Sequence, residues 1–503
     1  MAAAAIAAHA TVLSGGFIWL DRAHLTAGLA VRPRAEWLAL FREPFAGTGF
    51  YRPLTALSLS IDAAWGHPAL FHAVNLGLHA VAAMLLLLAA QALGASRRAA
   101  TLGALLFATH PVGSLVAGAI AFRSEALIAC GLFGLIAAHV KGRGALAALA
   151  VLVAGLSKET GLVLAPLFVA VVELEGRARR RWSVIAAEAL AFGLALGLRI
   201  AYAPPWLGRF PELGPSEAVG TRLGALAKSA SFVIAPLDRS ICDAFPVLSA
   251  HAPLAILGGL AALGLGALAW RGGSLGALTA LSLLPSLQLV PTLRWWSPHY
   301  LYLAAGLFLV LVARRIEGRG AAATTLALVA TLALGVLSWG DGRRYRNDEA
   351  LWRPEVARES ACREGHFYLA EAARERGDLP GAAEHLDAAL RSRAGMLAFV
   401  DLDAALTNYG VVLFSLRRYE EARQAFEGAL EHVGDERGRR KLNHDIATAM
   451  LASGDAHGAA ARLEPEVRRP DALPESLVVY ARALDALGRG AEAETIRRRR
   501  APR

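Results

Sequence analysis

The chain has 503 residues, of which 55% are hydrophobic, and it carries a formal charge of +10. This composition is too apolar for an ordinary soluble protein and favours a chain that is part membrane protein and part soluble protein. The positive charge does not indicate nucleic-acid binding, because only four of the 52 basic residues are lysines and many arginines flank apolar segments. The three cysteines, Cys130, Cys242 and Cys362, have no metal-ligand spacing.

Apolar stretches recur from the N-terminus to about residue 339. A membrane-spanning helix needs about 20 mostly apolar residues, and on that basis we expect about eleven spans. The candidate segments are 2–20, 71–93, 100–120, 125–140, 145–157, 161–174, 183–202, 252–270, 274–293, 300–313 and 321–339. Segment 2–20 lacks a basic start and runs directly into FIWLDR, which favours a retained span over a cleaved signal peptide.

Charges in the connections predict which ends of the spans face the cytosol. Basic residues gather in alternate short loops, and the positive-inside rule makes these loops cytosolic. They are Arg97, Arg98, Lys141, Arg143, Arg177, Arg179, Arg180, Arg181, Arg271, Arg314, Arg315 and Arg319. We therefore expect segments 21–70 and 203–251 and the C-terminal part on the non-cytosolic side, in a multi-pass protein such as one of the bacterial inner membrane.

The sequence changes character at about Trp339–Asn347, which predicts a membrane domain over 1–340 and a soluble domain over 341–503. FYLAEAARERGDLPGAAEHLDAAL places small residues at tetratricopeptide spacing, namely Ala370, Gly377, Ala382 and Ala389. TNYGVVLFSLRRYEEARQAFEGAL repeats this frame with Gly410, Ala422 and Ala429, and weaker units centre on Gly454 and Gly488. Corresponding positions recur after 40, 37 and 34 residues. The predicted fold class is all-α, a polytopic membrane domain followed by a tetratricopeptide solenoid. Such a solenoid binds polypeptides, and a structural cap is the alternative.

The first connection contains a candidate catalytic carboxylate. Asp21 directly follows the apolar FIWL, and the segment FYRPLTALSLSIDAAWG carries Tyr51, Arg52 and Asp62. Ionisable groups at the membrane boundary are costly and therefore informative. A carboxylate there can act as a general base toward a hydroxyl, or hold a divalent metal ion beside a phosphate. The alternative is an aspartate that only marks the end of an apolar helix.

Three further connections on the predicted non-cytosolic side carry cationic side chains. They are Arg123 with Glu125, Lys158 with Glu159, and Arg294 with His299. An arginine can clamp a phosphate with two hydrogen bonds, or it can pair with a neighbouring carboxylate or extend to the interface. Several cations around one carboxylate suit a lipid-phosphate donor. A transporter is disfavoured, because the charges lie in the connections between spans rather than in the middle of the spans and the sequence shows no inverted repeat.

A series of motifs resembles one protein family in chain order. The motifs are YRPLTALSLSIDAAWG, FHAVNLGLHAVAAMLLLL, LLFATHPVGS with FRSEAL, LSKETG, HYLYLAAG and RNDEALW, followed by the repeats. Together they are similar to the transmembrane and tetratricopeptide-repeat proteins related to protein O-mannosyltransferases. The resemblance covers nearly the entire chain.

The resemblance implies a C-type glycosyltransferase fold with its active site at the outer face. It implies a polyprenyl-phosphate-linked sugar, mannose-like, as donor and a Ser or Thr hydroxyl of a polypeptide on the repeats as acceptor. Asp21 falls on the family's catalytic acidic position, and His299 stands where many members carry arginine. We expect the donor phosphate to bind Arg123, Lys158, Arg294 and His299, with Glu125, Glu159 and Asp62 as auxiliary acids or metal ligands.

The chain departs from the family at a second acidic position. Leu20 precedes Asp21 where members commonly carry two acidic residues, and Gly113, Ser114 and Leu115 follow the His-Pro-Val motif where a histidine and an acid usually stand. Three explanations stay open. Asp21 alone suffices, or Glu125 or Asp62 substitutes, or the chain is a noncatalytic membrane scaffold that binds partners through its repeats.

Overall fold

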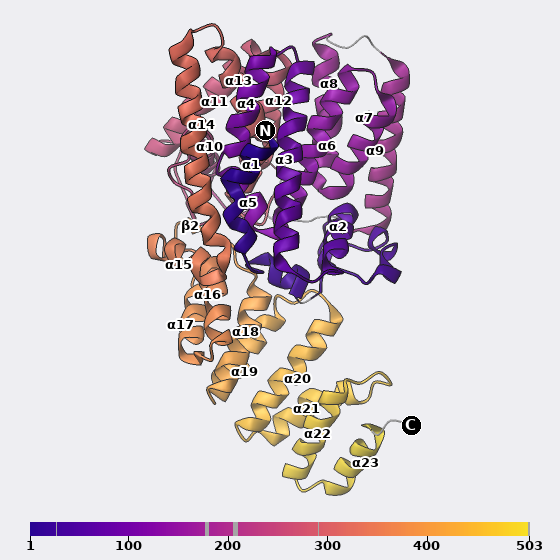
Figure 1. The fold of residues 1–503 in the computed structure, drawn as a ribbon. Helices are drawn as coiled ribbons and strands as arrows, with labels where there is room; N and C mark the ends of the chain where they lie inside the picture. The colour runs from indigo at the N-terminus through magenta and orange to yellow at the C-terminus, as the bar shows by residue number, and fades with distance from the viewer. Residues whose placement is uncertain (27, 177–180, 205–209, 290, 501–503) are drawn as a thin grey trace. The chain divides into compact units, whose positions relative to one another are not determined.

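A computed structural model describes residues 1–503 except 27, 177–180, 205–209, 290 and 501–503. The chain is nearly all helical, which confirms the predicted all-α class (Figure 1). The regular strands in the described residues are two short ones, β1 Phe245–Pro246 and β2 Met396–Leu397. Arg177, Arg179 and Arg180, which were used to predict orientation, lie outside the described residues, as does part of segment 203–251.

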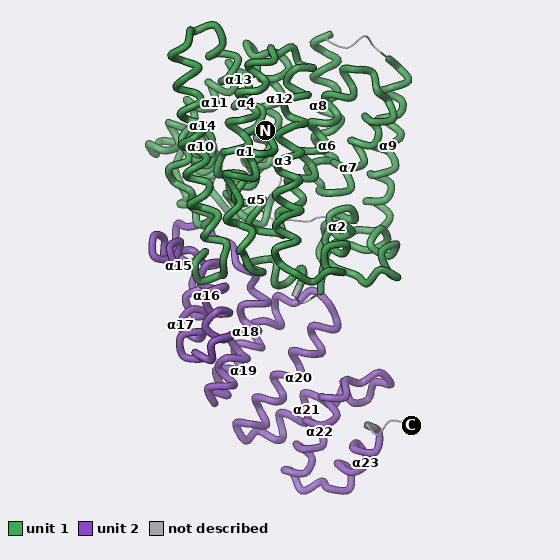
Figure 2. The backbone as a smooth tube through the Cα atoms, in the orientation of Figure 1, with its two compact units in different colours: residues 1–351 green, residues 352–503 purple. Residues whose placement is uncertain are grey.

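The chain divides into two compact units, residues 1–351 and 352–503, coloured separately in Figure 2. Unit 1 consists of helices connected by short 3-10 or π turns. Its α-helices are α1 Ala2–His9, α2 Pro53–Ala63, α3 Pro68–Ala92, α4 Arg97–Thr109, α5 Val112–Gly118, α6 Arg123–Val140, α7 Gly144–Ser157, α8 Glu159–Leu174, α9 Trp182–Tyr202, α10 Pro215–Ile234, α11 Pro253–Arg271, α12 Gly273–Ser282, α13 Tyr302–Ile316 and α14 Ala321–Gly342. The short turns are η1 Ala10–Ser14, η2 Arg22–Thr26, η3 Arg34–Glu36, η4 Ala39–Phe41, η5 Phe45–Gly47, η6 Ile120–Phe122, η7 Leu284–Leu287, η8 Pro298–Leu301 and η9 Arg343–Arg346.

Six helical segments of the described chain are long and apolar enough to cross a membrane. A seventh is possible by length if α4 and α5 form one span, although the two helices are bent by 54° at His110–Pro111. The count of about eleven expected from the sequence is not confirmed. The difference arises because the predicted spans 2–20, 145–157, 161–174 and 274–293 form shorter or interrupted helices.

The outer faces of several helices carry large apolar side chains. Leu190 of α9, Trp270 of α11 and Leu332 of α14 are each more than two-thirds exposed. The interior of unit 1, in contrast, encloses polar groups such as Arg123 and His79. This inversion of the pattern seen in soluble proteins is typical of helices that face lipid, and together with the long apolar helices it indicates a membrane protein.

Unit 2 consists of successive helical hairpins. After α15 Asp348–Arg358, within which the two units meet in sequence, the paired helices are α16 Arg363–Glu375 with α17 Leu379–Leu390, α18 Leu402–Ser415 with α19 Tyr419–Leu430, α20 Glu436–Ala452 with α21 Ala456–Val467, and α22 Pro474–Ala486 with α23 Gly490–Arg500. The turn inside each pair contains one residue with positive φ: Gly377 (79°), Arg417 (63°), Gly454 (96°) and Gly488 (76°).

Small residues allow the two helices of a hairpin to approach closely. Ala370, Ala382 and Ala389 are fully buried, and a Cβ added at Gly410 would lie 2.5 Å from the Phe426 ring. These are the positions at which the sequence pattern placed small residues. The assignment of the hairpins to tetratricopeptide repeats stays a prediction.

Candidate functional site

Asp21 lies in the connection after η1 and is completely buried. Its carboxylate accepts hydrogen bonds from the backbone amides of Ala121 at 2.7 Å, Ile120 at 3.3 Å and Ile18 at 3.4 Å. Two of these amides belong to η6, which leads into α6. Asp21 therefore lies at the N-terminal end of a helical segment, where unpaired amides stabilise a negative charge.

The surroundings of Asp21 oppose its ionisation. Burial raises the pKa of Asp21 to about 7, while the three amide hydrogen bonds act against this shift and the negative charge of Asp348 adds to it. A carboxylate with a pKa near neutrality can accept a proton at the pH at which it operates, as a general base must.

A second carboxylate fixes the backbone next to Asp21. The Trp19 amide donates to Asp348 Oδ1 at 2.7 Å, and Arg22 Nε donates to Asp348 Oδ2 at 2.5 Å. Trp19 has a φ of 52°, which is rare for a bulky side chain and costs free energy. Asp348, the first residue of α15, thus holds a strained residue in place two positions before Asp21.

Five cationic or titratable side chains form one cluster beside this connection. The charges of Lys158, Arg294 and Arg52 act on the His299 imidazole. Those of Arg52 and Arg294 also act on His24. We call these five residues the cationic cluster. It brings together side chains from η2, the start of α2, the α7–α8 break and the segment before α13.

Glu125 lies between two members of the cationic cluster. Lys158 Nζ donates to Glu125 Oε1, and His299 Nε2 is 3.9 Å from the same oxygen. Burial lowers the pKa of Lys158 although the carboxylate beside it favours the charged form. Lys158 occupies the break between α7 and α8, where the sequence predicted a hairpin tip.

Arg52 is held by the acid that follows Lys158. Arg52 Nε donates to Glu159 Oε2 at 3.0 Å, and the Tyr51 amide donates to Glu159 Oε1 at 2.7 Å. Burial favours the neutral form of Glu159, but the Arg52 guanidinium and these hydrogen bonds hold its pKa below the usual range. Arg52 is a cation of the cluster that was not among the residues expected from the sequence to bind phosphate.

The segment that carries Arg294 is fixed by Gln288. The Gln288 carboxamide nitrogen donates to the carbonyl oxygens of Arg294 at 3.0 Å and Trp295 at 2.8 Å. The Arg294 guanidinium lies over the Trp19 ring, 5.2 Å from its centroid. Trp19 in turn contacts Phe122, whose ring stacks on His299 at 4.4 Å. Aromatic contacts therefore connect the Asp21 connection to the cationic cluster.

Arg123 is directed into the protein interior. Its side chain is completely buried and forms an ion pair with Asp62 at 2.5 Å. Its guanidinium also donates to Asn75 Oδ1 at 2.6 Å and to the carbonyl oxygens of Ser58 at 3.0 Å and Phe71 at 3.1 Å. Because all three guanidinium nitrogens have protein acceptors, Arg123 would contact a phosphate only by giving up one of them. Asp62 is likewise occupied by Arg123.

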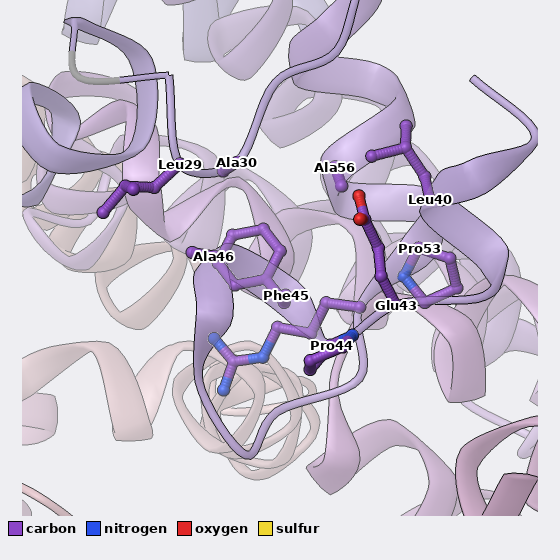
Figure 3. A pocket seen from close by; sticks show the side chains of 10 residues that line it. Leu29, Ala30, Leu40, Glu43, Pro44, Phe45, Ala46, Pro53 and Ala56 are labelled. Carbon is purple, nitrogen blue, oxygen red and sulfur yellow. The ribbon is translucent and has the colours of Figure 1, made fainter. Parts of the chain in front are cut away.

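A small hollow of about 10 Å³, about the space of one water molecule, opens next to Arg52. Figure 3 shows Leu29 and Ala30 on one side of it, Glu43 and Pro53 on the other, and the Phe45 ring between them. Phe45 also contacts His24, with the ring centroids 5.1 Å apart. Nδ1 of His24 is buried and forms no hydrogen bond within the described residues. The hollow has room for a water-sized group only, and the His24 nitrogen has hydrogen-bonding capacity that no described residue uses.

The structure thus brings Lys158, Arg294, His299, Glu125 and Glu159 to one place and puts Asp21 beside them through Trp19. It adds Arg52, His24 and Asp348, and it separates Arg123 with Asp62 into an interior pair. Asp348 stands in the RNDEALW motif, but its contact with residues over 320 positions earlier has no local sequence pattern.

Within the described residues, no group of three or more His, Cys, Asp or Glu side chains has the arrangement of a metal site.

The fold and site define a helical membrane protein with an enclosed carboxylate beside a cationic cluster. No family model matches the chain. The chain is similar to "Protein O-mannosyl-transferase Tmtc2" of Drosophila melanogaster, with 33% identity over 133 residues. This match covers 24% of the chain and 14% of that protein. The similarity supports a loose relationship to O-mannosyltransferase-like membrane proteins.

Proposed function

We propose that the protein is a membrane glycosyltransferase that moves a mannose-like sugar from a polyprenyl-phosphate donor to a Ser or Thr hydroxyl of a polypeptide. The observation that supports this proposal most is a group of cations beside the buried Asp21: Lys158 meets His299 at Glu125, Arg52 pairs with Glu159, and Arg294 lies over Trp19. The partial similarity to an O-mannosyltransferase supports it independently.

In the proposed reaction the acceptor hydroxyl oxygen attacks C1 of the sugar. The bond between C1 and the phosphate oxygen breaks, and its electron pair leaves with the polyprenyl phosphate. Asp21 accepts the hydroxyl proton. Lys158, Arg52 and Arg294 bind the leaving phosphate, and stabilisation of its growing negative charge is expected to be the larger contribution to the rate.

Asp21 is enclosed, so an acceptor reaches it only after the residues covering it move. Trp19 is two residues from Asp21, Phe122 follows the Ala121 amide that binds its carboxylate, and the two rings lie 5.0 Å apart. Trp19 has an unfavourable backbone conformation, which lowers the cost of displacing this segment. We assign Arg123, Asp62 and Asn75 to positioning, since they anchor α6 to α2 and α3.

The test is a transfer assay with purified full-length protein and a lipid-linked donor. Asp21→Asn keeps a hydrogen-bond acceptor for the Ala121 amide but cannot take a proton, and we expect transfer to fall by at least about 100-fold. Lys158→Met should lower the rate by a similar factor through loss of phosphate stabilisation. Glu212→Gln, which removes an exposed carboxylate, serves as the control and should retain activity. Wild-type transfer by Asp21→Asn would refute the assignment.

The pH profile tests the role of Asp21 separately. A base with a pKa of about 7 is protonated and inactive below that pH. We therefore expect kcat/KM to rise about tenfold per pH unit up to about pH 7 and then to level off. A flat profile between pH 5 and pH 8 would be incompatible with Asp21 as the base.

The acceptor polypeptide is proposed to bind the helical hairpins of unit 2 on the non-cytosolic side of the membrane. The sidedness rests on the distribution of loop arginines in the sequence. A reporter that is active only in the cytosol, fused after Arg503, should be inactive. Reporter activity would place the hairpins and the predicted outer face in different compartments and contradict this part of the proposal.

The alternative is a noncatalytic membrane scaffold. It is favoured by one observation, namely that the Asp21 carboxylate is already satisfied by three backbone amides, as in a purely structural helix cap. A scaffold should retain its partner proteins in pull-downs after Asp21→Asn and should carry no lipid-linked sugar in native mass spectrometry.

A further inference from the structure

A second cavity is lined by the start of α4, the end of α13 and the start of α14. Figure 1 labels these three helices. Its volume is about 880 Å³, within the range of about 300–1,000 Å³ that is usual for small-molecule sites. Its lining residues are Arg97, Arg98, Ala99, Thr101, Leu102, Leu105, Ala313, Ile316, Glu317, Gly318, Ala321, Thr324, Thr325 and Leu328. None of them belongs to the cationic cluster.

The mouth of this cavity has an excess of positive charge. Arg97 and Arg98 are exposed, and in the described part of the chain no side-chain hydrogen bond or ion pair engages either guanidinium. The one carboxylate in the lining, Glu317, accepts a hydrogen bond from the Ser96 hydroxyl. Three more arginines, Arg314, Arg315 and Arg319, lie at the end of α13 and in its connection to α14.

The wall of the cavity is apolar and continues onto an exposed apolar face of α14. Leu102 and Leu105 of α4 and Ile316 of α13 line the interior. Leu328 of α14 lines it as well and is 47% exposed, and its neighbours Leu326 and Leu332 are about 70% exposed. A ligand that satisfies both regions therefore has an anionic head and a hydrocarbon chain.

We propose that this cavity binds one anionic phospholipid, with its phosphodiester at Arg97 and Arg98 and an acyl chain along Leu102, Leu105 and Leu328. The loop arginines place this end of unit 1 on the predicted cytosolic side, where basic pockets between helices meet anionic headgroups. A free phosphate would leave the apolar wall in water, and a zwitterionic lipid would not use the excess of arginines. The proposal does not depend on sugar transfer.

The experiment is native mass spectrometry of the purified full chain with equal amounts of phosphatidylglycerol and phosphatidylcholine. We expect the protein to retain one phosphatidylglycerol molecule in preference to phosphatidylcholine. Each arginine near a lipid headgroup contributes about fivefold to binding, so R97Q/R98Q should weaken retention by about 25-fold. The control R143Q/R271Q removes two exposed basic residues that do not line the cavity and should retain the lipid.

Two further variants keep the test decisive if R97Q/R98Q is unstable. R97K/R98K preserves both charges and should retain the lipid, whereas Leu105→Trp fills the apolar interior and should reduce retention without changing the charge. Equal retention of phosphatidylcholine, full retention by Leu105→Trp, or displacement of the lipid by millimolar inorganic phosphate would overturn the proposal.

Discussion

Two arginines with carboxylate partners show how differently the two units use charge. Arg123 in unit 1 is completely buried and pairs with Asp62 at 2.5 Å. Arg423 in unit 2 pairs with Glu420 and, at 2.8 Å, with Glu427, and all three side chains are at least a quarter exposed. The same functional groups therefore meet in a buried interior in one unit and at an exposed surface in the other.

The difference predicts very different energetic consequences. Removing one partner of a buried pair leaves an uncompensated charge in a medium of low dielectric constant, which is strongly destabilising. Removing one partner of an exposed pair leaves a charge that water solvates at once. Unit 1 should thus depend on individual polar contacts, and unit 2 on the packing of small residues between its helices.

The largest effect is expected for Asp62→Ala. This change leaves Arg123 buried without its counter-charge and should destabilise unit 1 by about 3–5 kcal/mol. The measurement is thermal denaturation of the detergent-solubilised protein. Asp62→Asn is the comparison variant, because its carboxamide oxygen can still accept a hydrogen bond from Arg123 while the counter-charge is lost. If Asp62→Asn were as stable as the wild type, the uncompensated charge would not be the cause.

The next largest effect is expected for Gly410→Ala in unit 2. The new Cβ would lie 2.5 Å from the Phe426 ring, so α18 and α19 must separate, at a cost of about 1–3 kcal/mol. Gly428→Ala is the matched control, because its Cβ would meet Leu406 at an ordinary 3.5 Å and alanine favours helix. Hydrogen exchange in α18 and α19 of the full chain distinguishes the two, and equal protection in both variants would contradict the close-approach explanation.

A smaller, stabilising effect is expected for Arg417→Gly. Arg417 has a φ of 63° at the turn position that glycine occupies in the other three hairpins. Relief of the left-handed strain should exceed the entropic cost of glycine by about 0.5–1 kcal/mol. Slower hydrogen exchange in the flanking helices would support this, whereas a loss of protection would mean that the Arg417 side chain contributes more than its backbone costs.

The smallest effect is expected for Glu427→Gln. It removes one of the two carboxylates that pair with Arg423, but the arginine stays at a hydrated surface. The free energy of unfolding of unit 2 should therefore change by less than about 0.5 kcal/mol. Raising the salt concentration should shrink the difference further. A loss comparable to that of Asp62→Ala would remove the distinction between the two units.

The fold was predictable where the sequence pattern is local. The small residues at Ala370, Ala382 and Gly410 and the turn glycines Gly377 and Gly454 reflect contacts within one hairpin, and the structure places them as the pattern indicated. The number of membrane spans was not predictable from the sequence, because short apolar helices such as α7 have the composition of a span without its length. Hydropathy alone does not distinguish apolar surface facing lipid from apolar surface facing protein.

The candidate site was predictable only in its residue types. The cations Lys158 and Arg294 stand in motifs that mark connections between helices, and the structure brings them together around His299. The partners of Arg123 were not predictable, because Asn75 and Ser58 lie 48 and 65 residues away in sequence. Whether an arginine faces a substrate or the interior depends on such distant acceptors.

The contact of Asp348 with Trp19 and Arg22 has a consequence for biogenesis. Arg22 and Asp348 are separated by 326 residues, so the connection that carries Asp21 acquires this support only after the last long apolar helix of unit 1 has been synthesised. Until then the strained Trp19 lacks one of the hydrogen bonds that hold it. Completion of the site is thereby linked to completion of the membrane domain, and a chain truncated before Asp348 would lack this support for its first connection.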